Sequence, residues 1–438
     1  MTTEIAVMNK SGIALAADSA VTVASHTPKG KKIKIFNTAN KLFALSKHAP
    51  VGIMTYGNAT LMGIPWETII KCYRQSLDKT KLGTTKDYCD NFFDFLAKFN
   101  VGEDAERSHI HSIAASITLD IKNKLENQIK QTIKNKGNIA ETEIETILQN
   151  LIKENNKLFT PLAKKTPITN VSLTKLRKKY SQEIKDIITQ VLQGLPLKQY
   201  YRNMLLKNIY TAISIPRFHQ SGIVIAGFGE KEIFPSCYEY NIDAVIAGKV
   251  LKEDGRGNQI TSDNAATIVP FAQADEVAAF MEGVGDKIKR LTDKILPKIM
   301  ISTLSGKIIE VISQELTLDD KTKTRISKAI QKIGQGAYDE FNNVLQETKQ
   351  KYYIRPVIEA VKFLNKEELA QMAETLVNLV SFRKQVTLEE ETVGGPIDVA
   401  IITKGDGLIW INRKHYFNKE LNPHFFGKYF DSGDDKNG

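Results

Sequence analysis

Thr2-Thr3-Glu4-Ile5-Ala6-Val7-Met8 is the stretch that decides how the chain is interpreted. Polar and apolar residues alternate in it, the turn Asn9-Lys10-Ser11-Gly12 follows, and Ile13-Ala14-Leu15-Ala16-Ala17-Asp18-Ser19 is a second apolar run. This pattern predicts a β-hairpin. Further strands are expected over 31–36, 41–46 and 51–57, before any helical periodicity begins.

Three residues in and after this hairpin have the side chains of a catalytic set: Thr2, Asp18 and Lys34. No leader is expected before Met1, so removal of Met1 would leave Thr2 with a free α-amine. Such an amine, with a reference pKa of about 7.7–8.0, can take the proton of a threonine hydroxyl. A nearby ammonium favours the neutral amine, and a carboxylate can hold that ammonium in place. Lys32 and Lys41 are alternatives to Lys34 as the ammonium.

The same residues resemble the start of a proteasome β-subunit, a member of the N-terminal-nucleophile (Ntn) hydrolase superfamily. The resemblance rests on Thr2-Thr3, on Ala16-Ala17-Asp18 with Val21-Thr22 after it, and on Lys34-Ile35-Phe36. It implies that Thr2 is the nucleophile and that Asp18 and Lys34 complete the catalytic set. It also implies that the backbone N–H of Gly57, in Tyr56-Gly57-Asn58-Ala59, serves the oxyanion.

The chain departs from the family pattern at two places. The family carries an Asp and a Ser before a Gly-Gly turn, whereas Glu391-Thr392-Val393 precedes Gly394-Gly395 here. Thr392 is the candidate supporting residue, with Glu391 as the alternative. Where the family has a Ser before its third core helix, this chain has Gln273-Ala274.

The expected fold class is α+β, a four-layer αββα sandwich of the Ntn-hydrolase type with two long α-helical insertions. The proteasome-like core is assigned to residues 1–60, 216–285 and 366–420. The helical insertions are 61–215 and 286–365, and 421–438 is expected to be a partly disordered tail.

Periodicity predicts the elements between the first strands and the tail. Helices are expected over 65–78, 86–99, 103–136, 140–158, 172–193, 197–213, 275–281, 288–315, 320–348, 352–363 and 366–384. Strands are expected over 221–228, 232–240 and 241–250, with Ile268–Phe271 closing their sheet. A last hairpin is expected over 394–411, with its turn at Gly405-Asp406-Gly407.

Composition excludes several classes of protein. The 438 residues are 42% hydrophobic and 25% charged, which is typical of a globular chain. The three cysteines, Cys72, Cys89 and Cys237, form no CxxC or Cys/His cluster, so no metal or other cofactor is expected. No apolar run is long enough for a membrane span, which favours a cytoplasmic protein without membrane contact.

The pattern as a whole indicates a threonine-type amide hydrolase, most simply a proteasome-like peptidase that uses Thr2 on a peptide or protein substrate. The alternative is a catalytically inactive proteasome-like scaffold that binds a partner. A homo-oligomer with a geometry other than the standard double ring is expected, and an unfoldase or another protein is a further candidate partner. The net charge of +10 is attributed mainly to solvated helix faces, so nucleic acid is not expected as a partner.

Overall fold

The structure is a computed structural model. It describes residues 3–27, 30–165, 167–216, 221–317, 319–386, 394–415, 417–418 and 420–424. Two compact units divide the chain. The described residues of the first unit lie within Met1–Ala39, Ile260–Thr403 and Ile409–Gly438, and those of the second within Asn40–Gln259 and Lys404–Leu408.

The first unit contains a five-stranded sheet with the strand order β12-β1-β2-β13-β14. Its strands are β12 (Ala266–Ala272), β1 (Thr3–Asn9), β2 (Gly12–Ala17), β13 (Asp398–Thr403) and β14 (Gly407–Asn412). β1 pairs antiparallel with β2 and with β12, and β2 pairs antiparallel with β13. The predicted first and last hairpins are confirmed.

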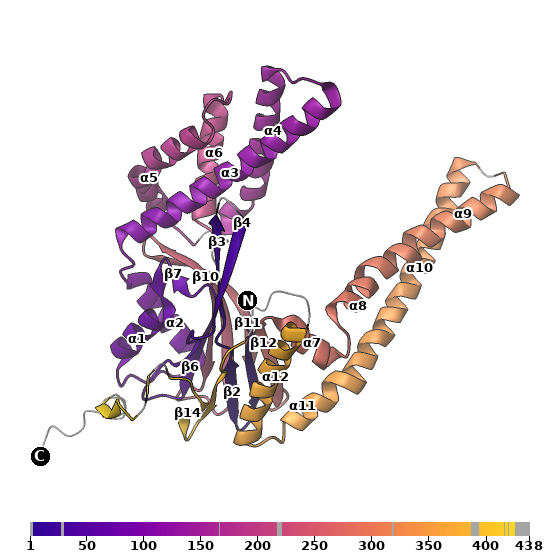
Figure 1. The fold of residues 1–438 in the computed structure, drawn as a ribbon. Coiled ribbons are helices and arrows are strands. Elements are labelled where there is room, and N and C mark those ends of the chain that lie inside the picture. The colour runs from indigo at the N-terminus through magenta and orange to yellow at the C-terminus, as the bar shows by residue number, and fades with distance from the viewer. Residues whose placement is uncertain are drawn as a thin grey trace, which may run out of the picture. The chain divides into compact units, whose positions relative to one another are not determined.

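Helix α12 (Lys366–Val386) packs against the centre of this sheet (Figure 1). Its Leu369, Ala373, Leu376 and Val380 recur at helical spacing and join one core cluster with apolar residues of β1, β2 and β13. Every residue of β1 and β2 is buried, so both faces of these two strands are covered. Residue 3 and the end of β2 therefore lie in the buried part of this sheet.

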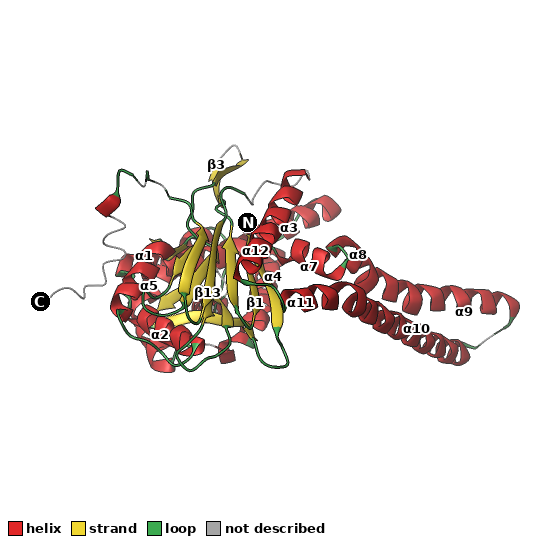
Figure 2. Ribbon diagram, turned by 90° about the horizontal axis from the view of Figure 1, so that it is seen from below, coloured by secondary structure: helices red, strands yellow, loops and turns green. Residues whose placement is uncertain are grey.

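A long helical hairpin continues from α7 (Ala274–Glu282) in the same unit. Its first arm is α8 (Asp286–Arg290), the π-helical segments η2 (Leu291–Ile295) and η3 (Lys298–Thr303), and α9 (Leu304–Glu315). Its second arm is α10 (Asp320–Lys349), followed by η4 (Gln350–Ile354) and α11 (Arg355–Val361). Figure 2 shows α9 and α10 side by side. The helices predicted here are confirmed, apart from the π-helical turns.

Two strands, β3 (Val21–Thr27) and β4 (Gly30–Phe36), form a separate antiparallel sheet. The sequence analysis predicted the second of these strands but missed the first. β3 was missed because its polar Thr22, Ser25 and His26 give it no apolar run. Lys34 therefore lies opposite Val23 in a ribbon that is not part of the five-stranded sheet.

The second unit contains another five-stranded sheet, with the order β11-β10-β9-β6-β5. Its strands are β11 (Lys249–Gln259), β10 (Ser236–Ile246), β9 (Ser221–Gly227), β6 (Val51–Gly57) and β5 (Leu42–Ala44). The pairs β11–β10, β10–β9, β9–β6 and β6–β5 are all antiparallel. β7 (Thr60–Leu61) and β8 (Ile64–Pro65) form a small separate pair.

Two strand predictions near this sheet are wrong. The predicted strands 232–240 and 241–250 were divided at residue 240, but β10 runs through to Ile246 and the turn falls at Ala247-Gly248. Both turn residues have positive φ, 50° and 70°, which the sequence does not reveal at an alanine. Residues 268–271 do not close this sheet, because β12 pairs with β1.

Helices α1 (Trp66–Leu77) and α2 (Thr85–Lys98) share a core cluster with the second sheet. The helices α3 (Glu103–Lys136), α4 (Glu141–Phe159), α5 (Asn170–Val191) and α6 (Gln199–Ile213) form a bundle around their own cluster. That cluster also takes in Ala244, Ile246 and Leu251 of β10 and β11. The six helices predicted between 65 and 213 are confirmed within three residues at each end.

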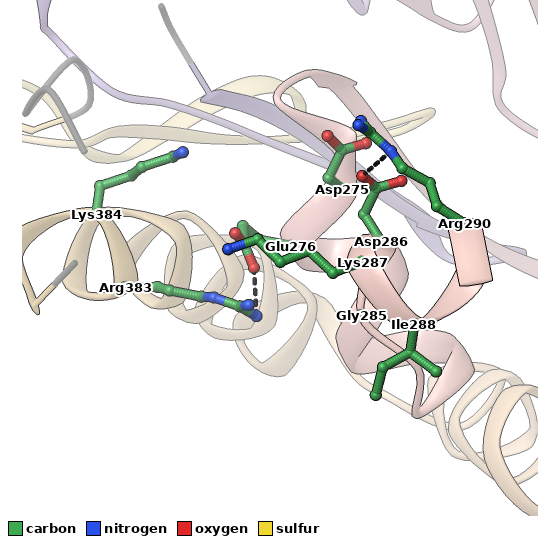
Figure 3. A pocket seen from close by; sticks show the side chains of 9 residues that line it. All are labelled: Asp275, Glu276, Gly285, Asp286, Lys287, Ile288, Arg290, Arg383 and Lys384. Atoms are coloured by element: carbon green, nitrogen blue, oxygen red, sulfur yellow. Dashed lines mark ion pairs between the residues drawn. The ribbon is translucent and has the colours of Figure 1, made fainter. Parts of the chain in front are cut away.

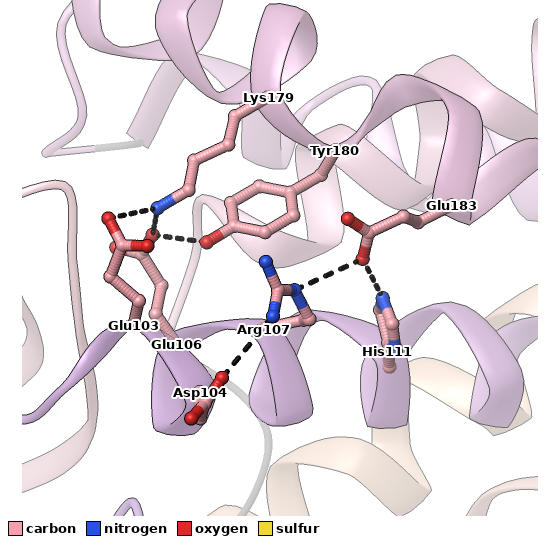
Figure 4. Close-up of polar contacts among 8 residues, drawn as sticks. All are labelled: Glu103, Asp104, Glu106, Arg107, His111, Lys179, Tyr180 and Glu183. Atoms are coloured by element: carbon pink, nitrogen blue, oxygen red, sulfur yellow. Dashed lines mark hydrogen bonds and ion pairs between the residues drawn. The ribbon is translucent and has the colours of Figure 1, made fainter.

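Polar contacts join α3 to α5 at one side of this bundle (Figure 4). The Tyr180 hydroxyl donates to Glu106 at 2.8 Å, and the His111 ring contacts Glu183 at 2.5 Å. The other carboxylate oxygen of Glu106 accepts from the backbone N–H of Ala247 at 3.0 Å. The bundle is thus joined to the β10–β11 turn by a hydrogen bond as well as by its core.

The assignment of core, insertions and tail stays a prediction, and residues 425–438 of the tail lie outside the described part of the chain. Among the helices that the structure describes, none combines the length and the apolar character that a membrane span requires. The architecture is α+β with antiparallel sheets.

Candidate active site

The Asp18 carboxylate is the centre of the candidate site. It follows β2 directly and is 1% exposed. Its Oδ1 accepts the backbone N–H of Thr3 at 3.1 Å, and its Oδ2 accepts those of Ala20 at 3.2 Å and Gly394 at 3.1 Å. Because a carboxylate only accepts hydrogen bonds, three converging N–H donors suit it. Asp18 thereby fixes three chain segments at one point.

Backbone bonds reinforce this junction. The N–H of Asp18 donates to the Thr3 carbonyl at 3.2 Å, and that of Ser19 donates to the Gly394 carbonyl at 3.2 Å. The Ser19 hydroxyl donates to the Pro396 carbonyl. The turn after residue 393 is therefore held against the end of β2.

Gly395 allows this turn to lie close to Asn37. Its φ is 78°, and a Cβ there would lie 2.8 Å from Cβ of Asn37 and 3.0 Å from the Asn37 carbonyl oxygen. Neither a side chain nor an ordinary L-residue conformation fits at this position. The Gly394-Gly395 pair in the sequence predicted a turn here, but the contact of that turn with Asn37 was not predicted.

Two of the predicted site residues, Thr2 and Thr392, lie outside the described residues, as does the alternative Glu391. Their described neighbours, Thr3 and Gly394, both donate to Asp18. The structure thus brings together the residue that follows Thr2 and a residue two positions after Thr392. The roles of Thr2 and Thr392 stay predictions.

Lys34 lies in β4, with its side chain exposed. Its ammonium lies 4.7 Å from the centroid of the Phe36 ring, a cation–π contact. Asp18 contacts backbone N–H groups of residues 3, 20 and 394, while Lys34 contacts Phe36. The predicted Asp18–Lys34 ion pair stays a prediction.

Gly57 belongs to the second unit, where it ends β6 with a φ of 77°. Next to it, the Tyr56 hydroxyl donates to Oε1 of Glu239 at 2.6 Å. The Tyr56 ring covers Gly222, since a Cβ there would be 1.9 Å from the ring. These contacts orient the end of β6, and the sequence analysis did not single out Tyr56, Gly222 or Glu239.

A charged pocket of about 530 Å³ lies in the first unit (Figure 3). It is formed by the first turn of α7, by α8 and by the end of α12. Arg383 pairs with Glu276 at 2.5 Å, and Arg290 pairs with Asp286 at 2.8 Å. Strand β12 leads directly into the pocket, because α7 starts two residues after Ala272, which pairs with Thr3.

Within the described ranges, no group of three or more His, Cys, Asp or Glu side chains is arranged to hold a metal ion. Burial raises the pKa of the Cys89 thiol to about 12 and raises that of Cys237 as well. These two thiols are therefore protonated and packed in the interior.

Comparisons with known proteins leave the family open. No protein-family profile matches the sequence, and no curated protein matches it significantly. Two solved structures that it resembles are an Anbu mutant from Hyphomicrobium sp. strain MC1 and Anbu, an ancestral beta-subunit, from Yersinia bercovieri. Both are 8% identical to this chain. Each match covers 100% of this chain, together with 99% of the Hyphomicrobium chain and 98% of the Yersinia chain. Their TM-scores, 0.25 and 0.24, are too low to support any conclusion.

Proposed function

We propose that the protein is a threonine-type amide hydrolase whose nucleophile is Thr2 after Met1 removal. The observation that carries this proposal is the hydrogen bond from the Thr3 N–H to Asp18. That nitrogen is bonded covalently to the carbonyl carbon of residue 2. This bond supports the proposal, because it joins the residue that follows Thr2 to the carboxylate that the mechanism uses.

In the proposed reaction, Thr2 Oγ1 attacks the carbonyl carbon of a peptide bond, and the α-amine of Thr2 takes the hydroxyl proton. The amine then gives this proton to the leaving nitrogen, and a water molecule hydrolyses the resulting ester. Gly57 would donate its N–H to the oxyanion. Lys34 would keep the amine neutral by like-charge repulsion.

The proposal includes the finer fold, a four-layer αββα sandwich in a cytoplasmic protein. The complete burial of β1 and β2 supports a sandwich, because a sheet with one solvated face leaves alternate residues exposed. A homo-oligomer and a peptide or protein substrate belong to the same proposal.

A catalytically inactive scaffold is the second candidate. The observation that favours it is the Lys34 ammonium, which is exposed and lies 4.7 Å from the centroid of the Phe36 ring.

Covalent capture tests the proposal. Intact-mass analysis should show loss of Met1, and an epoxyketone or β-lactone should add one mass increment to the wild type. Thr2→Ala should abolish the increment. Ser11→Ala, which removes an exposed hydroxyl at the other end of the β1–β2 hairpin, should retain it. Retention of Met1, or no capture by a folded wild type, would establish the scaffold instead.

A further inference from the structure

The helical hairpin of α9 and α10 has no fully buried large apolar side chain, although Ile312, Ile326 and Ile330 are half-buried. Its two arms contact each other along their length, and at Gly334 a Cβ would lie 2.3 Å from the Met300 carbonyl oxygen. The residues buried in α9 and α10 are Ser305, Gly334 and Lys349, and none of them has a large apolar side chain. The α3–α6 bundle differs, since it encloses a large apolar cluster.

Large apolar side chains are instead exposed along the hairpin. On α10, Ile333, Phe341 and Val344 are 72%, 41% and 58% exposed. They are spaced eight and three residues apart, with Ala337 between the first two, so they form one stripe along the helix. The first arm exposes Ile288, Leu291, Ile295 and Ile299. An apolar stripe of this length is typical of a surface that a partner covers.

The charges of α10 are divided between its two halves. After the first-turn Asp320, the amino-terminal half carries Lys321, Lys323, Arg325, Lys328 and Lys332, whereas the exposed charges of the carboxy-terminal half are Asp339, Glu340 and Glu347. The last residue of α10, Lys349, is buried and pairs with Glu282. If α10 of a second copy packed parallel to this helix, like charges would face each other. In an antiparallel arrangement, the basic half of each helix faces the acidic half of the other.

Gly336 lies at the boundary between these halves, and it is exposed with nothing within 4 Å of the position of a Cβ. A two-fold axis at this residue places Lys332 of one copy opposite Glu340 of the other. It likewise places Arg325 of one copy opposite Glu347 of the other. At 3.6 residues per turn, these four side chains and Gly336 all project along one flank of the apolar stripe. In an antiparallel helix pair the same flank of each helix meets its copy, so one geometry satisfies charge and shape together.

We propose that α10 is a dimerisation helix that pairs antiparallel with α10 of a second copy of this chain, about a two-fold axis near Gly336. Its 30 residues give a contact of up to about 45 Å at 1.5 Å per residue. The exposed apolar stripe supplies the buried surface of the pair, and the divided charges set its direction. The proposal does not depend on catalysis by Thr2.

A charge-swap experiment on the full chain tests this pairing. The first variant, Glu340→Lys with Glu347→Lys, makes α10 predominantly basic, and the second, Arg325→Glu with Lys332→Glu, makes it predominantly acidic. Each should dissociate at micromolar concentrations where the wild type is associated, with Kd raised at least about tenfold per reversed pair. An equimolar mixture of the two should reassociate as a heterodimer, because every facing pair is again complementary.

The control is Glu310→Lys, which reverses an exposed acid of α9 and should leave the particle mass unchanged. Particle mass is measured by light scattering and sedimentation velocity, and mixing is followed with one variant carrying a mass tag. A monomeric wild type, an assembly unaffected by either charge reversal, or reversed variants that do not reassociate on mixing would each overturn the proposal. Reassociation also shows that both variants are folded.

Discussion

The backbone N–H of Gly394 donates to Oδ2 of Asp18 at 3.1 Å across 376 residues of sequence. With the bonds from Thr3 and Ala20, this contact makes Asp18 the point where the first and last parts of the first unit meet. Hydrogen bonds to a buried charged group are stronger than neutral ones. The site's geometry therefore depends on one carboxylate.

Asp18→Asn should lower the free energy of unfolding by roughly 2–4 kcal/mol, because the amide has one acceptor oxygen and presents an NH₂ group to the remaining donors. Urea unfolding at neutral pH measures the loss. Asp120→Asn, at an exposed acid that pairs with Lys124, should cost no more than about 1 kcal/mol. Equal losses in the two variants would contradict the role of Asp18.

Gly395→Ala should destabilise the protein by about 2–4 kcal/mol, since it combines a positive φ with a Cβ that overlaps Asn37. Gly405→Ala is the matched control, because nothing lies within 4 Å of its Cβ position. That control should change stability by less than about 0.5 kcal/mol. Thermal and urea unfolding of both variants decide the point, and a neutral Gly395→Ala would exclude this close contact.

Gly222→Ala should cost at least about 2 kcal/mol, because a Cβ there overlaps the Tyr56 ring. The overlap disappears when the ring is removed. The double variant Gly222→Ala with Tyr56→Ala should therefore lose less stability than the two single losses added together. A double-mutant cycle by urea unfolding tests this, and strictly additive losses would show that the ring does not cover Gly222.

Glu239 should make stability depend on pH in the acid range. Burial alone would raise its pKa, but hydrogen bonds from Arg256 and Tyr56 outweigh burial and hold the pKa below 4.5. Because the folded pKa lies below the unfolded one, the stabilisation is complete above pH 4.5 and is lost as the pH falls through the folded pKa.

Glu239→Gln should therefore show a smaller loss of stability between pH 7 and about pH 4 than the wild type does. Urea unfolding at several pH values measures the difference. Glu253→Gln, at an exposed position of β11 in the same hairpin, should keep the wild-type pH profile. Indistinguishable profiles for all three proteins would contradict the assigned interaction.

The sequence predicts local structure well and long-range pairing poorly. The helix over 103–136 was assigned to the residue, since its apolar spacing and the Gly at 137 mark its course and end. β3 and the β10–β11 turn were missed, because a polar strand and an alanine with positive φ carry no local signal. The partnership of β12 with β1 is set by packing between residues more than 250 positions apart.

The candidate site shows the same division. Asp18 was singled out by its type and its place at the end of a strand, but its acceptor role was not predicted. Its three donors are backbone N–H groups, which every residue except proline has. Sequence reasoning therefore identifies the carboxylate and not the groups that surround it.

The order of strands in the first sheet has a consequence for synthesis on the ribosome. β1 and β2 are translated first, yet their outer neighbours β12 and β13 begin at residues 266 and 398. At about 5–20 residues per second, this pair waits tens of seconds for its neighbours. The second unit is nearly continuous over 40–259, so it can fold on the nascent chain while the first sheet still lacks β12 and β13. Limited proteolysis of ribosome-bound chains ending near residue 300 should find the second unit protected and β1–β2 cleavable. The segment that carries the candidate nucleophile is thus among the first residues made and among the last to reach its final environment.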